Sequence, residues 1–299
     1  MSETEAPPAP TLAADPVEIA PGVHVIPDRR VPLVPNVGVV AGGERTLVID
    51  TGMGPRNGDR ALAHARSLAA GTPLTLTITH FHPEHGFGAQ SFAPVAQIVY
   101  NRTQLDELQR KGDAYVTLFR GFGPAVEEAL EGVALVDPNE TYEGELALDL
   151  GGVDVRLQEV GGGHTLGDQV VWLPEARILF TGDLVENRFF PIFPFFPPDD
   201  ADVSGVRWIE VLEQLEALEP ETVVPGHGEV GDAGLVAAVR GYLVELRDAV
   251  AGAVESGWSA DRAAEELEPQ ILSRYPSWEQ PEWVGFGIRA FHAELSSGS

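Results

Sequence analysis

The chain has 299 residues, of which 43% are hydrophobic and none is cysteine, so it can bury a substantial core but cannot form disulfides, thiolate metal sites or a cysteine nucleophile. Its 19 Lys and Arg residues are outnumbered by 46 Asp and Glu residues, and the net charge of -27 argues against nucleic-acid processing and binding to anionic membranes. We therefore expect one large domain or two small ones, a small molecule as partner, and any metal to be held by His, Asp or Glu.

The N-terminal segment, residues 1–16, is acidic and rich in Pro and Ala, and offers little to bury. This composition predicts a disordered tail. The segment has neither a basic region nor an apolar core of the kind that marks a secretory signal. No apolar run reaches the roughly 18 residues that a transmembrane helix needs. We expect a cytoplasmic location on these grounds.

Short β-rich runs and helical patterns alternate from Val23 onward. The predicted strands are 23–26, 36–40, 46–49, 74–79, 133–136, 144–150, 153–160, 169–173, 177–181 and 223–224. The predicted helices are 57–70, 103–111, 203–218, 235–254 and 259–267, the last capped by Ser259. A glycine-containing turn between the second and third strands predicts a hairpin. The interleaved pattern indicates an α/β or α+β class without internal repeats.

Residues 188–198 form a segment too rich in proline for a helix or a central strand, RFFPIFPFFPP. We expect an irregular aromatic loop. It can plug the core or form a subunit contact, or it can wall an apolar substrate pocket. The nearby Asp168 and Asn187 are candidates for orienting ligands or substrate.

Three of the eight histidines fall in the six residues that follow the predicted strand 74–79, in the sequence HFHPEH. Histidines two apart on an extended segment point to the same side, so His80 and His82 can converge on one ion. The turn expected at Pro83 directs Glu84 and His85 toward a neighbouring point. This arrangement favours two adjacent metal ions.

Four further candidates also follow apolar runs. His164, Asp183 and His227 lie in the sequences GGGHT, FTGD and PGHG, where glycine lets the backbone approach an ion closely. Asp50 ends the apolar run that precedes it. Loops at strand ends are where a rigid scaffold presents chemical groups.

These five motifs, in this order over about residues 20–230, resemble the metallo-β-lactamase superfamily. The resemblance implies a four-layer αββα sandwich with a dinuclear metal site. It implies that the metallo-β-lactamase domain covers residues 17–232. A helical extension, residues 233–299, is then expected to pack on the same domain.

The resemblance also implies a role for each motif residue. It assigns the first metal to His80, His82 and His164. It assigns the second metal to Glu84, His85 and His227. Asp183 would bridge the two ions, and Asp50 would orient a ligand histidine from behind.

Glu84 departs from the superfamily pattern, which normally has Asp at this position. The additional methylene moves the carboxylate by more than the roughly 0.2 Å tolerance of a metal–ligand bond. Glu84 can still ligate, can serve only as a base, or can leave a single-metal centre.

The implied activity is hydrolysis. Nitrogen and oxygen ligands suit Zn²⁺, and two zinc ions are expected, although Fe and Mn are also compatible. Metal-bound hydroxide would attack an ester, thioester, lactone or amide carbonyl of a small substrate with an apolar portion. Asp183 would position the hydroxide, and Glu84 or Asp183 would accept its proton.

Two other functions compete with the hydrolase. The first is a non-haem iron oxidoreductase, similar to a sulfur dioxygenase, that uses His80, His164 and Asp183. The second is a catalytically silent binding module, which is disfavoured because all seven potential ligands are present. A homodimer is compatible with the sequence.

Overall fold

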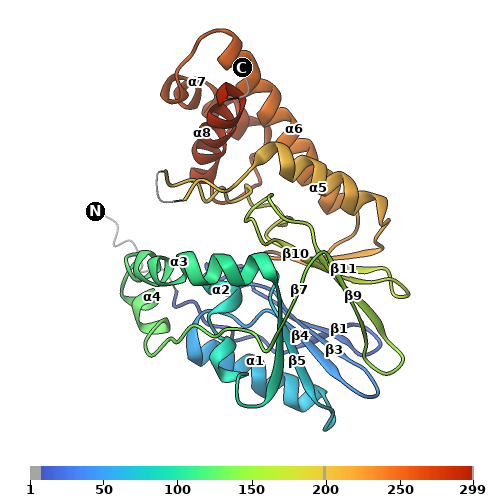
Figure 1. Cartoon of the computed structure of the whole chain (residues 1–299). Coiled ribbons are helices and arrows are strands. Elements are labelled where there is room, and N and C mark those ends of the chain that lie inside the picture. The colour runs from blue at the N-terminus through green and yellow to red at the C-terminus, as the bar shows by residue number, and fades with distance from the viewer. Residues whose placement is uncertain (1–7, 198–199, 298–299) are drawn as a thin grey trace. The chain divides into compact units, whose positions relative to one another are not determined.

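The computed structural model describes residues 8–197 and 200–297, which form two compact units (Figure 1). The first unit comprises the chain up to Glu159 together with Val171–Ala176, and the second comprises Val160–Val170 and the chain from Arg177 onward. The strands form a seven-stranded sheet in the order β1-β2-β3-β4-β5-β6-β7 and a five-stranded sheet in the order β12-β11-β10-β9-β8. The predicted mixed α/β class with a helical C-terminal region is confirmed.

The elements of the described residues alternate as the sequence indicates. The strands are β1 (Val17–Ala20), β2 (Val23–Ile26), β3 (Val37–Ala41), β4 (Thr46–Ile49), β5 (Leu74–Thr77), β6 (Ala96–Asn101), β7 (Glu140–Tyr142), β8 (Glu145–Asp149), β9 (Asp154–Glu159), β10 (Gln169–Leu173), β11 (Ile178–Gly182) and β12 (Thr222–Pro225). The helices are α1 (Gly54–Leu68), α2 (Pro83–Gly86), α3 (Arg102–Arg120), α4 (Pro124–Ala129), α5 (Gly205–Ala217), α6 (Gly234–Glu255), α7 (Ala260–Arg274) and α8 (Glu282–Ser297), with a short 3₁₀ turn at Ala89–Ser91.

The order of strands in the first unit explains where its chemical groups gather. β3 and β4 form the predicted antiparallel hairpin, whereas β4, β5 and β6 run parallel. Every residue of β4 and β5 is buried, as is typical of parallel strands covered on both faces. Because parallel strands end at the same edge of a sheet, the residues after β4 and β5, Asp50 and His80, follow strand ends that lie side by side.

Two buried phenylalanines fix the loop after β5. Phe81 and Phe87 lie on either side of α2 and belong to the hydrophobic core of the first unit. Complete burial of a phenylalanine side chain contributes about 1.5–3 kcal/mol relative to leaving it exposed. The histidine-rich loop is therefore anchored to the core at both of its ends.

The predicted disorder of residues 1–16 does not hold for the described part of this segment, residues 8–16. Leu12 is 1% exposed, and its N–H donates a hydrogen bond of 2.9 Å to Asn57 Oδ1. Asn57 Nδ2 in turn donates to the carbonyl oxygen of Pro10 at 2.7 Å. One buried leucine and one asparagine on α1 therefore fix a segment whose composition alone indicates disorder. Residues 1–7 lie outside the described residues.

Other expectations need correction at individual elements. Residues 133–136 form no strand; their apolar side chains pack against the core from an irregular segment. The predicted elements include no counterpart of β1, β6, β7, α4 or α8. The predicted domain boundary between residues 232 and 233 remains a prediction.

The second unit contains the parallel pair β11 and β12 and the helices α5 to α8. The predicted cap at Ser259 is confirmed, because its hydroxyl accepts a hydrogen bond from the N–H of Arg262 at 3.3 Å. α8 packs against both α6 and α7. No helix among the described residues combines the length and the apolar character needed to cross a membrane.

The phenylalanine-rich segment is an irregular loop that fills the core of the second unit. Phe189, Phe190 and Phe193 are buried, whereas Phe195 and Phe196 are half-buried. The first three side chains therefore act as a plug over the core. Residue 198, the last of the predicted loop, lies outside the described residues.

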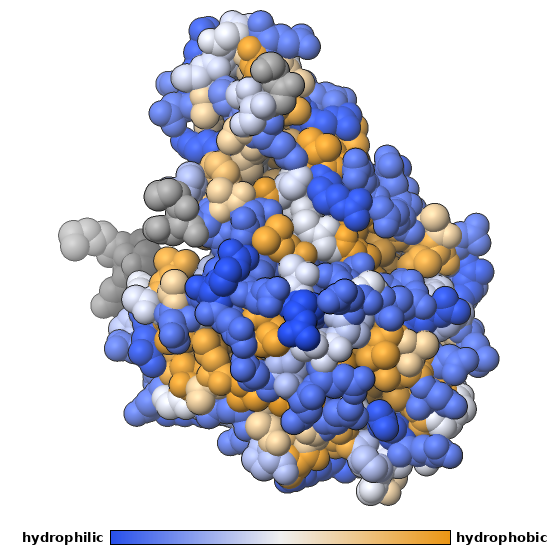
Figure 2. All heavy atoms as spheres, viewed as in Figure 1, coloured by the Kyte–Doolittle hydropathy of each residue, from blue (hydrophilic) through white to orange (hydrophobic). Residues whose placement is uncertain are grey.

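Hydrophilic side chains predominate on the face of the molecule drawn in Figure 2, with smaller apolar areas between them. The large hydrophobic side chains that remain exposed among the described residues are Val17, Val95, Leu118 and Phe122. This distribution agrees with the net charge of -27.

Candidate metal centre

Asp50 lies at the centre of a buried hydrogen-bond network in the first unit. Its Oδ1 accepts from the N–H of Thr79 at 2.7 Å, and its Oδ2 accepts from the Thr79 hydroxyl at 2.9 Å. The same Oδ2 lies 2.8 Å from His85 Nδ1. Donation from His85 Nδ1–H to the carboxylate leaves Nε2 of this ring for a metal. The structure therefore places Asp50 against a predicted ligand, where an orienting carboxylate is needed.

The backbone and surroundings of Asp50 are unusual. Its φ of 66° is in the left-handed region, which aspartate tolerates better than most residues and which often occurs at functional sites. Burial raises the pKa of the neighbouring Tyr100 hydroxyl, and the negative charge of Asp50 raises it further. Tyr100 therefore stays neutral at physiological pH, so Asp50 acts beside a neutral phenol in a poorly hydrated environment.

The histidine rings of the first unit are closely packed. The rings of His80 and His82 meet edge to face with centroids 4.7 Å apart, and those of His80 and His85 lie 4.2 Å apart. His82 also stacks on the ring of Tyr115 from α3, with centroids 5.0 Å apart and planes 19° apart. All three imidazoles are buried, so their orientations are set by packing.

Glu84 lies in the first turn of α2, which begins at Pro83, and its side chain is buried. The turn predicted at Pro83 is thus a single helical turn. Gln104 of α3 holds the backbone that follows β5 in place, because its Nε2 donates hydrogen bonds to the carbonyl oxygens of Ile78 and Thr79. Gln104 was not among the predicted site residues, although its capping box with Asn101 is a recognisable sequence pattern.

In the second unit, Asp168 organises the loop that carries His164. Its Oδ2 accepts from the N–H of His164 at 2.7 Å, and its Oδ1 accepts from the N–H and the hydroxyl of Thr165. His164 Nδ1 lies 2.9 Å from the carbonyl oxygen of Ile192. Donation to that carbonyl leaves Nε2 of His164 for a metal.

Asp183 turns its two carboxylate oxygens toward two different histidines. Oδ2 lies 3.8 Å from His164 Nε2, and Oδ1 lies 3.6 Å from His227 Nε2. Ligand atoms about 2.0–2.1 Å from one tetrahedral ion are separated by roughly 3.4 Å, so both spacings are close to those of ligands that share an ion. Asp183 therefore has one oxygen toward each of these two histidines, and its bridging role remains a prediction.

Asn187 and Gly228 shape the chain around His227. The N–H of Asn187 donates to the carbonyl oxygen of His227 at 2.9 Å, and Asn187 Nδ2 donates to that of Glu229. Gly228 has a φ of 85°, and a Cβ at this position would lie 2.9 Å from Asn187 Cβ. Asn187 therefore orients the backbone of a candidate ligand; a contact with substrate remains a prediction.

Gly226 must lack a side chain because a Cβ there would collide with Asp183 Oδ1. We expect Gly226→Ala to displace the Asp183 carboxylate and to lower the metal content of the purified protein. Gly241→Ala in α6 is the control, since nothing lies within 4 Å of a Cβ at that position. Elemental analysis of both variants, with thermal unfolding alongside, makes the comparison; equal metal content in the two would contradict this role of Gly226.

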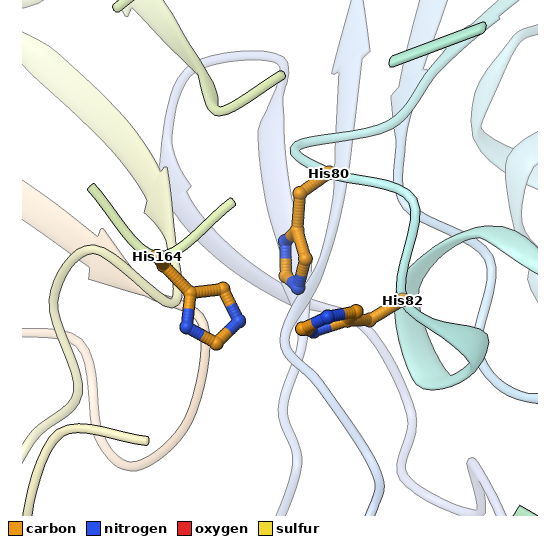
Figure 3. A group of neighbouring side chains, drawn as sticks. All are labelled: His80, His82 and His164. Carbon is orange, nitrogen blue, oxygen red and sulfur yellow. The ribbon is translucent and has the colours of Figure 1, made fainter. Parts of the chain in front are cut away.

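All seven predicted ligands belong to groups that could each hold a metal ion. One group contains His80, His82 and His164, and the other contains Glu84, His85, Asp183 and His227. Every member of both groups is buried. Figure 3 shows the three histidines of the first group. The donors are imidazole nitrogens and carboxylate oxygens, which suit zinc, iron or manganese.

The chain also matches a protein family by its sequence, and this family is the one that the histidine and aspartate motifs indicate. The Metallo-beta-lactamase superfamily matches residues 30–227, and the chain belongs to this superfamily. The match includes all seven candidate ligands and Asp50 and ends at His227, before α6 begins.

Two curated relatives resemble part of the chain. Acyl-coenzyme A thioesterase MBLAC2 of Bos taurus is 29% identical over 169 residues, which cover 50% of this chain and 58% of that protein. Linear primary-alkylsulfatase of Pseudomonas sp. (strain ATCC 19151) is 24% identical over 174 residues, which cover 50% of this chain and 33% of that protein. The matches therefore span less than two thirds of both relatives.

Solved structures show the same fold over more of the chain. The sec-alkylsulfatase Pisa1 from Pseudomonas sp. matches with a TM-score of 0.74 at 16% identity, covering 94% of this chain and 50% of that one. A metallo-beta-lactamase family protein from Thermus thermophilus matches with a TM-score of 0.67 at 18% identity, covering 94% of this chain and 95% of that one. The likeness in fold extends beyond the residues of the family match.

Proposed function

We propose that this protein is a hydrolase with two zinc ions that cleaves a carboxylic thioester or ester of a small molecule with an apolar portion. Membership of the superfamily and its thioesterase and sulfatase relatives make a hydrolase plausible. The observation that carries the proposal is Asp183, whose two oxygens face His164 and His227, one histidine from each candidate group. A carboxylate placed in this way suits a dinuclear centre.

The residues present suit two metal ions, one held by His80, His82 and His164 and the other by Glu84, His85, Asp183 and His227. When bound, such ions lower the pKa of a coordinated water toward about 7 and polarise a carbonyl oxygen. In this proposal, Asp183 orients the attacking water and accepts its proton. Asp50 and the Ile192 carbonyl hold His85 and His164 in the tautomer that presents Nε2. Burial of the ligands keeps bulk water from competing with these groups.

The substrate class is tested with the purified protein on a panel of acyl-coenzyme A thioesters, carboxylic esters, lactones and alkyl sulfates. We expect the thioesters or carboxylic esters to be hydrolysed, with turnover on the order of 1–100 per second. A chelator should abolish turnover and added zinc should restore it. Cleavage of alkyl sulfates alone would contradict the carbonyl substrate, and oxygen consumption by an iron-loaded protein would contradict the hydrolase.

The contribution of Glu84 has its own test. We expect Glu84→Ala to reduce the zinc bound from two equivalents to one, because the three histidines of the other group remain. Glu84→Asp restores the usual superfamily residue and is expected to retain two equivalents. Zinc titration monitored by calorimetry measures both. Two equivalents bound by Glu84→Ala with the affinities of the wild-type protein would contradict ligation by Glu84.

A further inference from the structure

The phenylalanine-rich segment joins the C-terminal helices to the candidate ligand His164. We infer that α6 and α8 position the His164 imidazole through residues 188–193, and that Phe193 is the positioning residue. The inference rests on the proposed function, because it takes His164 as a metal ligand. It assigns a task to helices that lie beyond the family match.

The contact with the ligand is a backbone contact. His164 Nδ1 lies 2.9 Å from the carbonyl oxygen of Ile192, and His164 is 1% exposed. That carbonyl selects the tautomer of the ring and its direction, since His164 has Nε2 turned toward Asp183 Oδ2. The position of the Ile192 carbonyl depends on the backbone of its own segment, so the residues around Ile192 determine whether this hydrogen bond forms.

One anchor of the segment lies before Ile192. The N–H of Phe190 donates to the carbonyl oxygen of Glu279 at 3.1 Å, and the N–H of Glu279 donates to that of Arg188 at 2.9 Å. The Phe190 ring lies 5.5 Å from the rings of Tyr242, on α6, and of Trp278. The backbone of Glu279, between α7 and α8, is thus hydrogen-bonded to the segment on both sides of Phe189, as in a pair of β-strands.

The second anchor lies directly after Ile192. Phe193 is 0% exposed, and its ring lies 5.2 Å from that of Trp208 and 5.7 Å from that of Phe291 on α8. A Cβ on Gly287 of α8 would lie 3.2 Å from the Phe193 ring and 3.0 Å from Leu246 of α6. The Phe193 ring and Leu246 of α6 therefore both lie close to Gly287 of α8, which leaves little room for a side chain at that position.

Proline transmits the position of Phe193 to Ile192. Pro191 and Pro194 flank the two residues and restrict the backbone torsions of this short stretch. A shift of the Phe193 ring is therefore passed to the adjacent carbonyl. Loss of a hydrogen-bond partner behind a ligand histidine typically costs about 10- to 100-fold in metal affinity.

The test compares the zinc dissociation constants of Phe193→Ala, Phe193→Leu and two controls, measured by competition with a chromophoric chelator. We expect Phe193→Ala to weaken zinc binding about 10- to 100-fold, and Phe193→Leu to recover most of the loss. Phe196→Ala, at a half-buried position against Phe286, should leave the constant unchanged. Leu215→Ala in the core of α5 should lower the melting temperature without weakening zinc binding.

A second variant covers the case in which Phe193→Ala does not fold. Gly287→Ala presses on the same ring from the side of α8 and should weaken zinc binding in the same direction. The absorption spectrum of the cobalt-substituted protein should change in both variants and in neither control. Folded Phe193→Ala or Gly287→Ala with wild-type zinc affinity and cobalt spectrum would overturn the inference. A wild-type protein that binds no zinc would instead overturn the proposed function.

Discussion

Replacing Asp183 with Asn is expected to lower the turnover of the zinc-loaded protein by on the order of a thousandfold, which corresponds to several kcal/mol of lost transition-state stabilisation. Both carboxylate oxygens face a histidine nitrogen, at 3.6 and 3.8 Å. An amide has one oxygen and one NH₂ group. It can therefore present an oxygen toward His164 or toward His227, but not toward both. It also removes the group that we propose takes the proton from the attacking water.

The control for this variant is Asp248→Asn, which makes the same chemical change at an exposed residue paired with Arg247. Turnover of both variants is measured at saturating thioester after loading with zinc, and the zinc content is measured on the same samples. Retention of more than a tenth of wild-type turnover by Asp183→Asn would contradict the bridging role.

Trp208→Ala is expected to have the largest effect on stability, a loss of about 3–5 kcal/mol in the free energy of unfolding. Trp208 is 0% exposed, and its ring packs on the rings of His164 and Phe193. Its Nε1 also donates a hydrogen bond of 2.9 Å to the carbonyl oxygen of Leu184. The substitution therefore leaves both a cavity and a buried carbonyl without its donor.

Chemical denaturation monitored by circular dichroism measures the free energy of unfolding of the wild-type protein and of each variant. Trp283→Ala is the control, because Trp283 is only half-buried on α8 and its indole N–H bonds to Gln280, three residues away. We expect this control to lose less than half as much stability as Trp208→Ala. Equal losses in the two variants would contradict the central packing role of Trp208.

The parts of the fold that the sequence predicts well are those where one strong pattern acts alone. The bounds of β2, β4 and β10 agree with prediction because each is a short run in which β-branched or other apolar residues predominate. The candidate ligands were found for the same reason, since each follows such a run. Residues 133–136 have the same apolar character, yet they pack against the core without forming a strand, because pairing depends on a partner that composition does not reveal.

The supporting contacts of the site were beyond prediction for a different reason. Stacking of Tyr115 on His82 and donation from His164 to the Ile192 carbonyl join residues 33 and 28 positions apart, and neither leaves a local pattern. A carbonyl oxygen is present at every residue, so nothing in the amino-acid sequence distinguishes the Ile192 carbonyl as the partner of His164. The docking of Leu12 on Asn57 likewise depends on packing that only the folded chain brings about.

Elemental analysis of the protein, purified without added metal, tests the central claim most directly. We predict two zinc ions per chain in the wild-type protein, and fewer in the variants Gly226→Ala and Glu84→Ala, whose substitutions disturb candidate ligands. A wild-type protein that carries no metal, or a single iron, would contradict it.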